Sequence, residues 1–243
     1  MSATYVYGLV RSDAELPDDL VGLGPSGTVT TVVHEKVAAI VGDVPLDRPL
    51  GTRDDLVAHE AVVDSVAAHT TVLPMRFPAV IEEEGVLDEL LAPHHDRFVR
   101  ALDQLEGTVQ YTLKGRYDQD VLLREVVEED EGVRELQERI RGVPEDAAYY
   151  DRVKLGELIV KALEERREVD AKDILDRIGS FAEAVSSTTP TQPEDVVNAA
   201  FLVRRDGAEE FEAAVEELGA DTHEWLKLRL LGPLAPYDFV PEE

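Results

Sequence analysis

The first part of the chain combines short apolar runs with one helical pattern. Residues 5–10, YVYGLV, are apolar and rich in β-forming side chains, which predicts a central strand. Two further short strands are expected at 28–33 and 36–42, separated by a tight turn. Apolar positions then recur at helical spacing over 52–69, after a Thr-Arg-Asp-Asp start that suits a helix N-terminus. These patterns predict a small mixed sheet with a helix.

A segment with two prolines and a second helical pattern follow. Residues 70–81, TTVLPMRFPAVI, predict extended chain at a sheet edge or an irregular crossing, because proline leaves a ladder hydrogen bond unmade. Helical spacing returns over 84–105, where Pro93 is expected to kink or restart the helix. Gly107 marks the next change of pattern. We therefore expect an N-terminal α+β domain over 1–106.

The remaining sequence predicts strands separated by helices. Alternation over 108–114 predicts a half-buried strand, and a long, charged helical region fills 118–186. A strand at 196–203, a short helix and an amphipathic strand at 226–230 follow. This order predicts a ferredoxin-like α/β sandwich with a long helical insertion and helices on one sheet face. The other face is expected to be open and wetted by Gln110, Thr112, Lys114, Lys227 and Arg229.

This C-terminal α+β domain is expected to span 107–243 and to end in an extended tail, 232–243. The segment LLGPLAPYDFV carries much apolar surface, although its prolines stop the strand ladder and favour an extended path. Two interpretations are open for Tyr237, Phe239 and Val240. They fill a groove between the domains, or they anchor a partner protein, as exposed aromatic residues often do.

Other apolar residues carry similar alternatives. Met75 and Phe77 lie between prolines and are expected either in the core or at the border of a contact surface. Trp225, the only tryptophan, is expected on the same side of its strand as Lys227. Its ring is then either exposed to solvent or in contact with a helix, a domain or a partner. Tyr149 and Tyr150 begin a helix and are expected to pack between it and the sheet. The candidate interdomain or partner contacts are Met75, Phe77, Trp225, Tyr237, Phe239 and Val240.

Acidic residues greatly outnumber basic ones. Asp and Glu number 52 and Lys and Arg 24, so the formal net charge is −28. A surface this negative repels nucleic acids and anionic lipids, which argues against partners of either kind. The charge also favours solubility. The acidity and the excess of Arg over Lys fit a salt-adapted or a GC-rich source, and both remain open.

Composition also narrows the cellular location. The sequence contains no cysteine, which excludes disulfides, thiolate metal sites and cysteine nucleophiles. No apolar run approaches the length of a membrane span. The first residues, MSATYVYGLV, lack the basic region of a signal peptide. We therefore expect an intracellular protein.

The sequence offers no constellation that indicates catalysis. His59-Glu60 lies in a helical pattern, but Val63 stands where the zinc-protease spacing requires its second histidine. His94-His95-Asp96 is the densest ligand-like cluster, yet adjacent helical residues point about 100° apart and do not converge on one ion. Walker A and G-x-S-x-G patterns are absent. We expect no catalytic, cofactor-binding or metal-ligating residue, although an enzyme assembled from distant residues stays conceivable.

Six apolar segments, taken in order, resemble the gas vesicle protein GvpF/GvpL family. Each segment alone is weak evidence for the family, but the ordered set is specific to it and covers nearly the whole chain. The segments are YVYGLV at 5–10, HEAVV at 59–63, TVLPMRF at 71–77, AYYDRVKLGELI at 148–159, NAAFLV at 198–203 and LLGPLAPYDFV at 230–240.

The resemblance implies a two-domain α+β protein without enzymatic activity. Such proteins are minor shell-associated components or assembly factors of gas vesicles. The implied partners are the small, hydrophobic shell protein and other accessory gas vesicle proteins, with no small-molecule substrate and no cofactor. The implied location is the gas vesicle, with a cytoplasmic stage before assembly. The alternatives are a soluble enzyme and a generic binding module, each built on ferredoxin-like domains.

Overall fold

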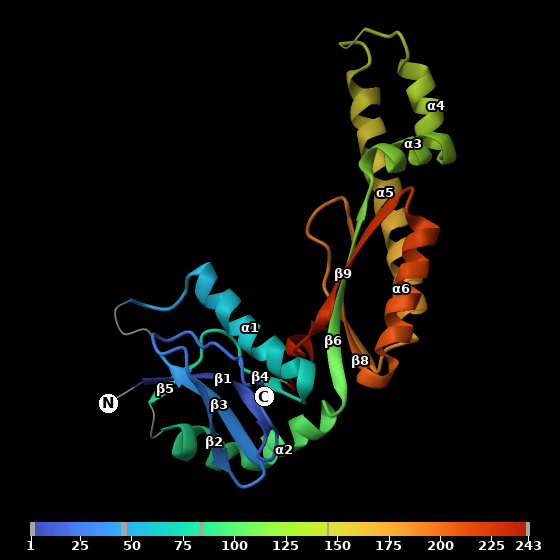
Figure 1. Ribbon diagram of the computed structural model, residues 1–243. Coiled ribbons are helices and arrows are strands. Elements are labelled where there is room, and N and C mark those ends of the chain that lie inside the picture. Colours follow the sequence, from blue (N-terminus) through green and yellow to red (C-terminus); the bar gives the residue numbers. More distant parts are fainter. Residues whose placement is uncertain (1–2, 45–47, 83–84, 145, 242–243) are drawn as a thin grey trace. The chain divides into compact units, whose positions relative to one another are not determined.

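The computed structural model describes residues 3–44, 48–82, 85–144 and 146–241. The chain forms two compact units (Figure 1). Unit 1 comprises Met1–Tyr111, Ala200–Ala208 and Leu231–Glu243, and unit 2 comprises Thr112–Ala199 and Glu209–Leu230.

Unit 1 is built on an antiparallel sheet whose central strand is β1, so the mixed sheet expected from the sequence is wrong. The strand order is β2-β3-β1-β4, and β5 also pairs with β1. The strands are β1 (Ala3–Arg11), β2 (Val29–His34), β3 (Val37–Asp43), β4 (Leu73–Pro74) and β5 (Val80–Glu82). Glu35 adopts a φ of 50° in the tight turn between β2 and β3. The three strands and the turn expected in this part of the sequence are therefore confirmed.

Two helices cover this sheet. Helix α1 (Arg53–His69) lies over one face, and α2 (Ala92–Gln104) lies over the other (Figure 1). Residues 5–10 of β1 are consequently all buried, as the apolar run predicted. The core between α1 and the sheet contains Tyr5, Tyr7, Val10, Ala38, Ile40, Val62, Val63, Val66, Ala67, Val72 and Ala235.

Local sequence explains where both helices begin. Thr52 and Asp55 form a reciprocal capping box at the start of α1, and Arg48 forms a two-bonded ion pair with Asp55. This pair with Arg48 holds the pKa of Asp55 well below its usual range. A π-helical turn, Val86–Leu91, precedes α2, and Pro93 lies in the first turn of α2. The expected restart of the helix at Pro93 is therefore confirmed, because a first-turn proline loses no intrahelical hydrogen bond.

Unit 2 contains most of a second sheet with the order β7-β8-β6-β9. The strands are β6 (Thr108–Tyr117), β7 (Ala184–Ser187), β8 (Asp195–Arg204) and β9 (Leu226–Leu234). Helices α5 (Tyr149–Gly179) and α6 (Ala208–Thr222) run along it, and Arg177 of α5 pairs with Asp221 of α6 at 2.8 Å. The mixed α+β fold with two sheets is confirmed. The helical region expected over 118–186 is wrong at its end, because α5 ends at Gly179 and the short edge strand β7 begins at Ala184.

The finer domain predictions stay predictions. The element order β6, helices, β7, β8, α6, β9 fits a ferredoxin-like arrangement. The proposed domains 1–106 and 107–243 agree with the two units over most of their length. They differ at 107–111, at 200–208 and at the tail, which all belong to unit 1.

The first turn of α5 contradicts a sequence-based prediction. Tyr149 is 61% exposed and Tyr150 85% exposed, so neither packs between helix and sheet. Helix α5 has 31 residues and is therefore about 46 Å long, whereas a ten-residue strand spans about 33 Å. Its C-terminal part buries Ile174 and Ile178, and its N-terminal part packs against α3 (Gln119–Glu129) and α4 (Glu131–Ile140) instead.

Candidate functional site: an apolar groove beside the tail

The tail begins at Gly232, a position that only glycine can occupy without strain. Its φ of +145° lies in a region that other residues rarely adopt. A Cβ at this position would lie 2.6 Å from Cδ1 of Tyr111 and 3.0 Å from the carbonyl oxygen of Gln110. The following residues Ala235 and Pro236 are buried, and a short 3-10 turn, Tyr237–Phe239, completes the described tail with Val240 and Pro241.

Hydrogen bonds with Asp64 and Gln110 help to hold the tail within unit 1. The Ala235 N–H donates to Oδ1 of Asp64 at 2.8 Å. The Asp238 N–H donates to Oε1 of Gln110 at 3.1 Å, and Nε2 of Gln110 donates to the Asp238 carboxylate at 2.6 Å. These bonds link the tail to α1 and to β6, and they give the side chains of Asp64 and Gln110 hydrogen-bond partners.

These bonds correct one prediction about the open sheet face. Gln110 was expected to be wetted, but it is only 4% exposed. Alternation along β6 correctly separates Gln110 from the face of Tyr111, but alternation does not reveal that the tail covers Gln110. Thr112 is half-buried, whereas Lys114, Lys227 and Arg229 are exposed as expected.

His59 of α1 lies at the centre of a buried polar cluster beside the tail. Its Nε2 is 3.0 Å from the Met75 carbonyl oxygen and 2.9 Å from the Tyr237 hydroxyl. Its Nδ1 is 3.0 Å from the Tyr5 hydroxyl. A carbonyl oxygen only accepts, so the proton of the neutral ring is placed on Nε2, and Nδ1 accepts from Tyr5. The cluster therefore connects β1, α1, the 70–81 segment and the tail.

Burial sets the protonation of this cluster. It lowers the pKa of His59 and raises the pKa values of Tyr5 and Tyr237, so all three groups are neutral near pH 7. Burial also raises the pKa of Asp64, although the hydrogen bond from Ala235 opposes that shift. The neutral aromatic groups favour a structural role for the cluster.

The depressed pKa of His59 predicts a loss of stability in mild acid. As the pH falls, His59 takes up a proton near pH 6.5 in the unfolded chain but only at a lower pH in the folded chain. Below pH 6.5, acid therefore favours unfolding. We expect the free energy of unfolding to be unaffected by His59 above about pH 6.5. Below it, that free energy should fall by up to about 1.4 kcal/mol per pH unit until the folded pKa is reached.

Urea unfolding of the wild-type chain between pH 7.5 and 5.5 measures this effect. His59→Gln should remove most of the pH dependence of the free energy of unfolding, even if the variant is less stable than the wild type at every pH. His69→Gln, at an exposed position, is the matched control and should keep the wild-type dependence. An equal slope in His59→Gln and in the wild type would contradict the assignment.

A small apolar groove lies at the end of the tail, within unit 1. Its volume is about 200 Å³. Met75 from the 70–81 segment and Val240 from the tail contribute to it, although 165 positions separate them in the sequence. The Arg97 guanidinium, 3.5 Å from the Pro241 carbonyl oxygen, lies at its polar border. The lining consists of Leu73, Pro74, Met75, Leu90, His94, Arg97, Phe98, Ala101, Val240 and Pro241.

The structure thus places the six predicted contact residues in different surroundings. Met75 and Val240 line the groove, while Phe77 and Tyr237 pack against the core of unit 1. Phe239 is half-buried in the tail. Trp225 belongs to unit 2, where its ring lies 5.9 Å from that of Tyr117 and Arg166 stacks over it. Its expected place on the Lys227 side of the strand is wrong, because its ring packs against Tyr117 and against Arg166 of α5. Whether these residues contact a partner stays a prediction.

Sequence reasoning missed the residues that fix the tail. His59 was considered only as a metal-ligand candidate, and Asp64 and Gln110 were not connected with the tail. A polar residue among the apolar positions of α1 was the available signal at His59, because buried polar groups need partners. The partner of Gln110 lies 128 positions away, and no local pattern indicates it.

The described residues provide neither a cluster of metal ligands nor a membrane-spanning helix. No group of three or more His, Asp or Glu side chains there is arranged to hold a metal ion. His95 bonds instead to its neighbour Asp96 at 3.0 Å. Within the same residues, none of the helices is both long and apolar enough to span a membrane.

Comparison with known proteins places the chain in a family. The model of the family "Gas vesicle synthesis protein GvpL/GvpF" matches residues 3–241. Gas vesicle protein F of a Streptomyces species is 34% identical over 241 residues, covering 98% of this chain and 99% of the relative. Gas vesicle protein L of the same Streptomyces is 28% identical over 265 residues, covering 97% and 92%.

Solved structures agree in fold. The crystal structure of the gas vesicle protein GvpF from an Anabaena species superposes with a TM-score of 0.85, at 23% identity and with full coverage of both chains. GvpF from Microcystis aeruginosa superposes with a TM-score of 0.77, also at 23% identity and full coverage. Taken with the full-length family match, these similarities show that the chain belongs to the GvpL/GvpF family of gas vesicle synthesis proteins.

Proposed function

We propose that this gas vesicle protein is a non-catalytic component, either a minor structural protein or an assembly factor. It binds the hydrophobic shell subunit and other accessory gas vesicle proteins while vesicles form. It is cytoplasmic before assembly and then associates with the vesicle. The observation that carries this proposal is the family match over residues 3–241.

The geometry of unit 1 supports a binding role. A shell subunit that faces gas must expose apolar surface before assembly, and such surface aggregates unless it is covered. The groove beside the tail is mainly apolar and is fixed by packed elements. The net charge of −28 keeps the chain in solution while an apolar segment is bound. We therefore assign the groove as the place where the shell subunit is held.

Vesicle fractionation tests the proposed association. We expect the chain to float with intact vesicles and to remain on them through a wash in 1 M salt, because salt screens ionic contacts but leaves apolar contacts in place. The same host without the shell subunit gene is the control, and the chain should then stay in the liquid below. Recovery of all the chain below the vesicles, or unchanged vesicle formation after deletion of its gene in a host without a paralogue, would contradict the proposal.

A further inference from the structure

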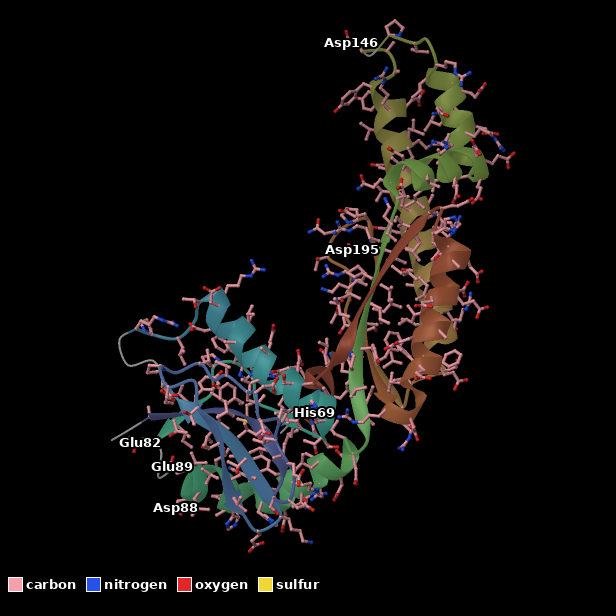
Figure 2. The ribbon with its side chains drawn as sticks, in the orientation of Figure 1. His69, Glu82, Asp88, Glu89, Asp146 and Asp195 are labelled. Atoms are coloured by element: carbon pink, nitrogen blue, oxygen red, sulfur yellow. The ribbon has the colours of Figure 1, made fainter. Side chains whose placement is uncertain are left out.

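A second groove lies on the open sheet face of unit 2 and is basic in an otherwise acidic protein. Its volume is about 660 Å³, within the range of ligand-binding sites. Figure 2 labels Asp195 at the start of β8, and this carboxylate is the one acidic side chain in the lining. Four basic side chains, from β6 and β9, share the groove with it: Lys114, Arg116, Lys227 and Arg229.

The charge of this groove is only partly neutralised. Arg116 pairs with Asp195 at 3.0 Å, and Lys227 pairs with Asp118 at 2.9 Å. Lys114 and Arg229 are exposed and have no ion pair with any residue that the structure describes. Lys114 and Arg229 are therefore available to a ligand that carries negative charge.

One wall of the groove is well defined. Gly115, Val197 and Leu228 also border the groove, but Leu228 alternates with Lys227 and Arg229 along β9, so its side chain points to the opposite face of the sheet. The loop after β7 forms one wall and is fixed to β8, because Nδ2 of Asn198 donates to the Thr188 hydroxyl at 2.8 Å. The groove thus combines a fixed wall with a row of basic side chains.

We propose that this groove binds an extended acidic segment of a protein partner, in which every second residue is acidic. Successive side chains of an extended chain point to opposite sides, so alternate carboxylates would face the groove together. These carboxylates would pair with Lys114 and Arg229. Nucleic acid is the weaker candidate, because the lining contains no aromatic side chain on which a base could stack.

The net negative charge of the protein does not prevent this binding at physiological salt. The Debye length is about 8 Å at 0.15 M ionic strength, so distant carboxylates are screened while contacts inside the groove persist. Affinity should therefore be highest at moderate ionic strength and should fall again above about 0.5 M salt. The inference does not depend on the proposed function, because this groove shares no residue with the apolar groove of unit 1.

Fluorescence polarisation with labelled pentapeptides tests the proposal. The probe is Glu-Leu-Glu-Leu-Glu, and Gln-Leu-Gln-Leu-Gln is the uncharged control. Lys114→Gln with Arg229→Gln should weaken binding of the acidic probe at least ten-fold. Lys154→Gln with Lys161→Gln removes the same charge from exposed positions on α5 and should change the affinity less than two-fold.

Four results would overturn the proposal. The first is equal affinity in the groove variant and the wild type, and the second is equal binding of the two peptides. The third is tighter binding of an oligodeoxythymidine that depends on Lys114 and Arg229, which would make this a nucleic-acid site. The last is displacement of the probe by millimolar inorganic phosphate, which would indicate a site for small anions. Melting temperatures of both double variants verify that they remain folded.

Discussion

Removal of residues 233–243 is expected to lower the melting temperature by about 10 °C. The deletion takes away Ala235 and Pro236, which are buried, and the half-buried aromatic ring of Tyr237. Burying an apolar side chain contributes about 1.5–3 kcal/mol when burial is complete. The lost contacts should therefore cost several kcal/mol, and for a chain of 243 residues each kcal/mol corresponds to about 2–4 °C.

Groups left behind by the deletion add to this loss. Asp64 would lose the N–H of Ala235, and Gln110 would lose both of its bonds to Asp238. Because the deletion also exposes these side chains to water, each lost hydrogen bond costs its net contribution of about 0.5–1.5 kcal/mol. The tail is therefore expected to stabilise unit 1 as a packed element.

Thermal unfolding followed by circular dichroism measures the effect, and Tyr237→Phe provides a graded comparison. That substitution keeps the ring and removes only the hydroxyl group beside His59, so it should cost about 1 kcal/mol. If the shortened chain melts within 2 °C of the full chain, the tail does not stabilise unit 1. The alternative, in which the tail serves only to anchor a partner, would then be preferred.

The sequence predicted the elements of this fold better than their surroundings. The burial of β1 followed from an uninterrupted apolar run, and the start of α1 from Thr52 and two acidic residues, because these signals are local. The exposure of Tyr150 was missed because helical periodicity does not show where a long helix outruns its sheet. The same limit applies to Gln110, whose environment is set by a segment 128 positions away.

The candidate site shows the same contrast between local sequence signals and surroundings that are set by distant segments. Met75 and Val240 were each identified as possible contact residues from their apolar surroundings in the sequence. Their place in one groove depends on how β4, α2 and the tail pack, which no periodicity encodes. The basic groove of unit 2 was predicted only as a wetted face, because sequence alternation shows which side chains share a face but not which of them lack a counter-ion.

Substitution of two groove residues is expected to abolish most of the binding of the shell subunit. Met75→Gln with Val240→Gln replaces two apolar side chains by polar amides, and glutamine matches the length of methionine and exceeds that of valine. Each apolar contact contributes about 1.5 kcal/mol or more to an interface when it is fully desolvated. The double variant should therefore bind at least ten-fold more weakly, since 1.4 kcal/mol corresponds to a factor of ten.

The matched control places the same substitution at exposed positions of unit 1 outside the groove. Val33 and Val80 are 53% and 49% exposed, and neither lines the groove. Val33→Gln with Val80→Gln should leave both the melting temperature and the binding unchanged. The groove variant should also melt within a few degrees of the wild type, so that weaker binding is not a consequence of unfolding.

The most direct test is the affinity of the full chain for the shell subunit, kept soluble by fusion to a carrier protein and measured by surface plasmon resonance. The account predicts saturable binding to the fusion and none to the carrier alone, with at least a ten-fold loss in Met75→Gln with Val240→Gln and no loss in the control variant. Absence of binding to the shell subunit, or equal binding by the folded groove variant, would contradict it.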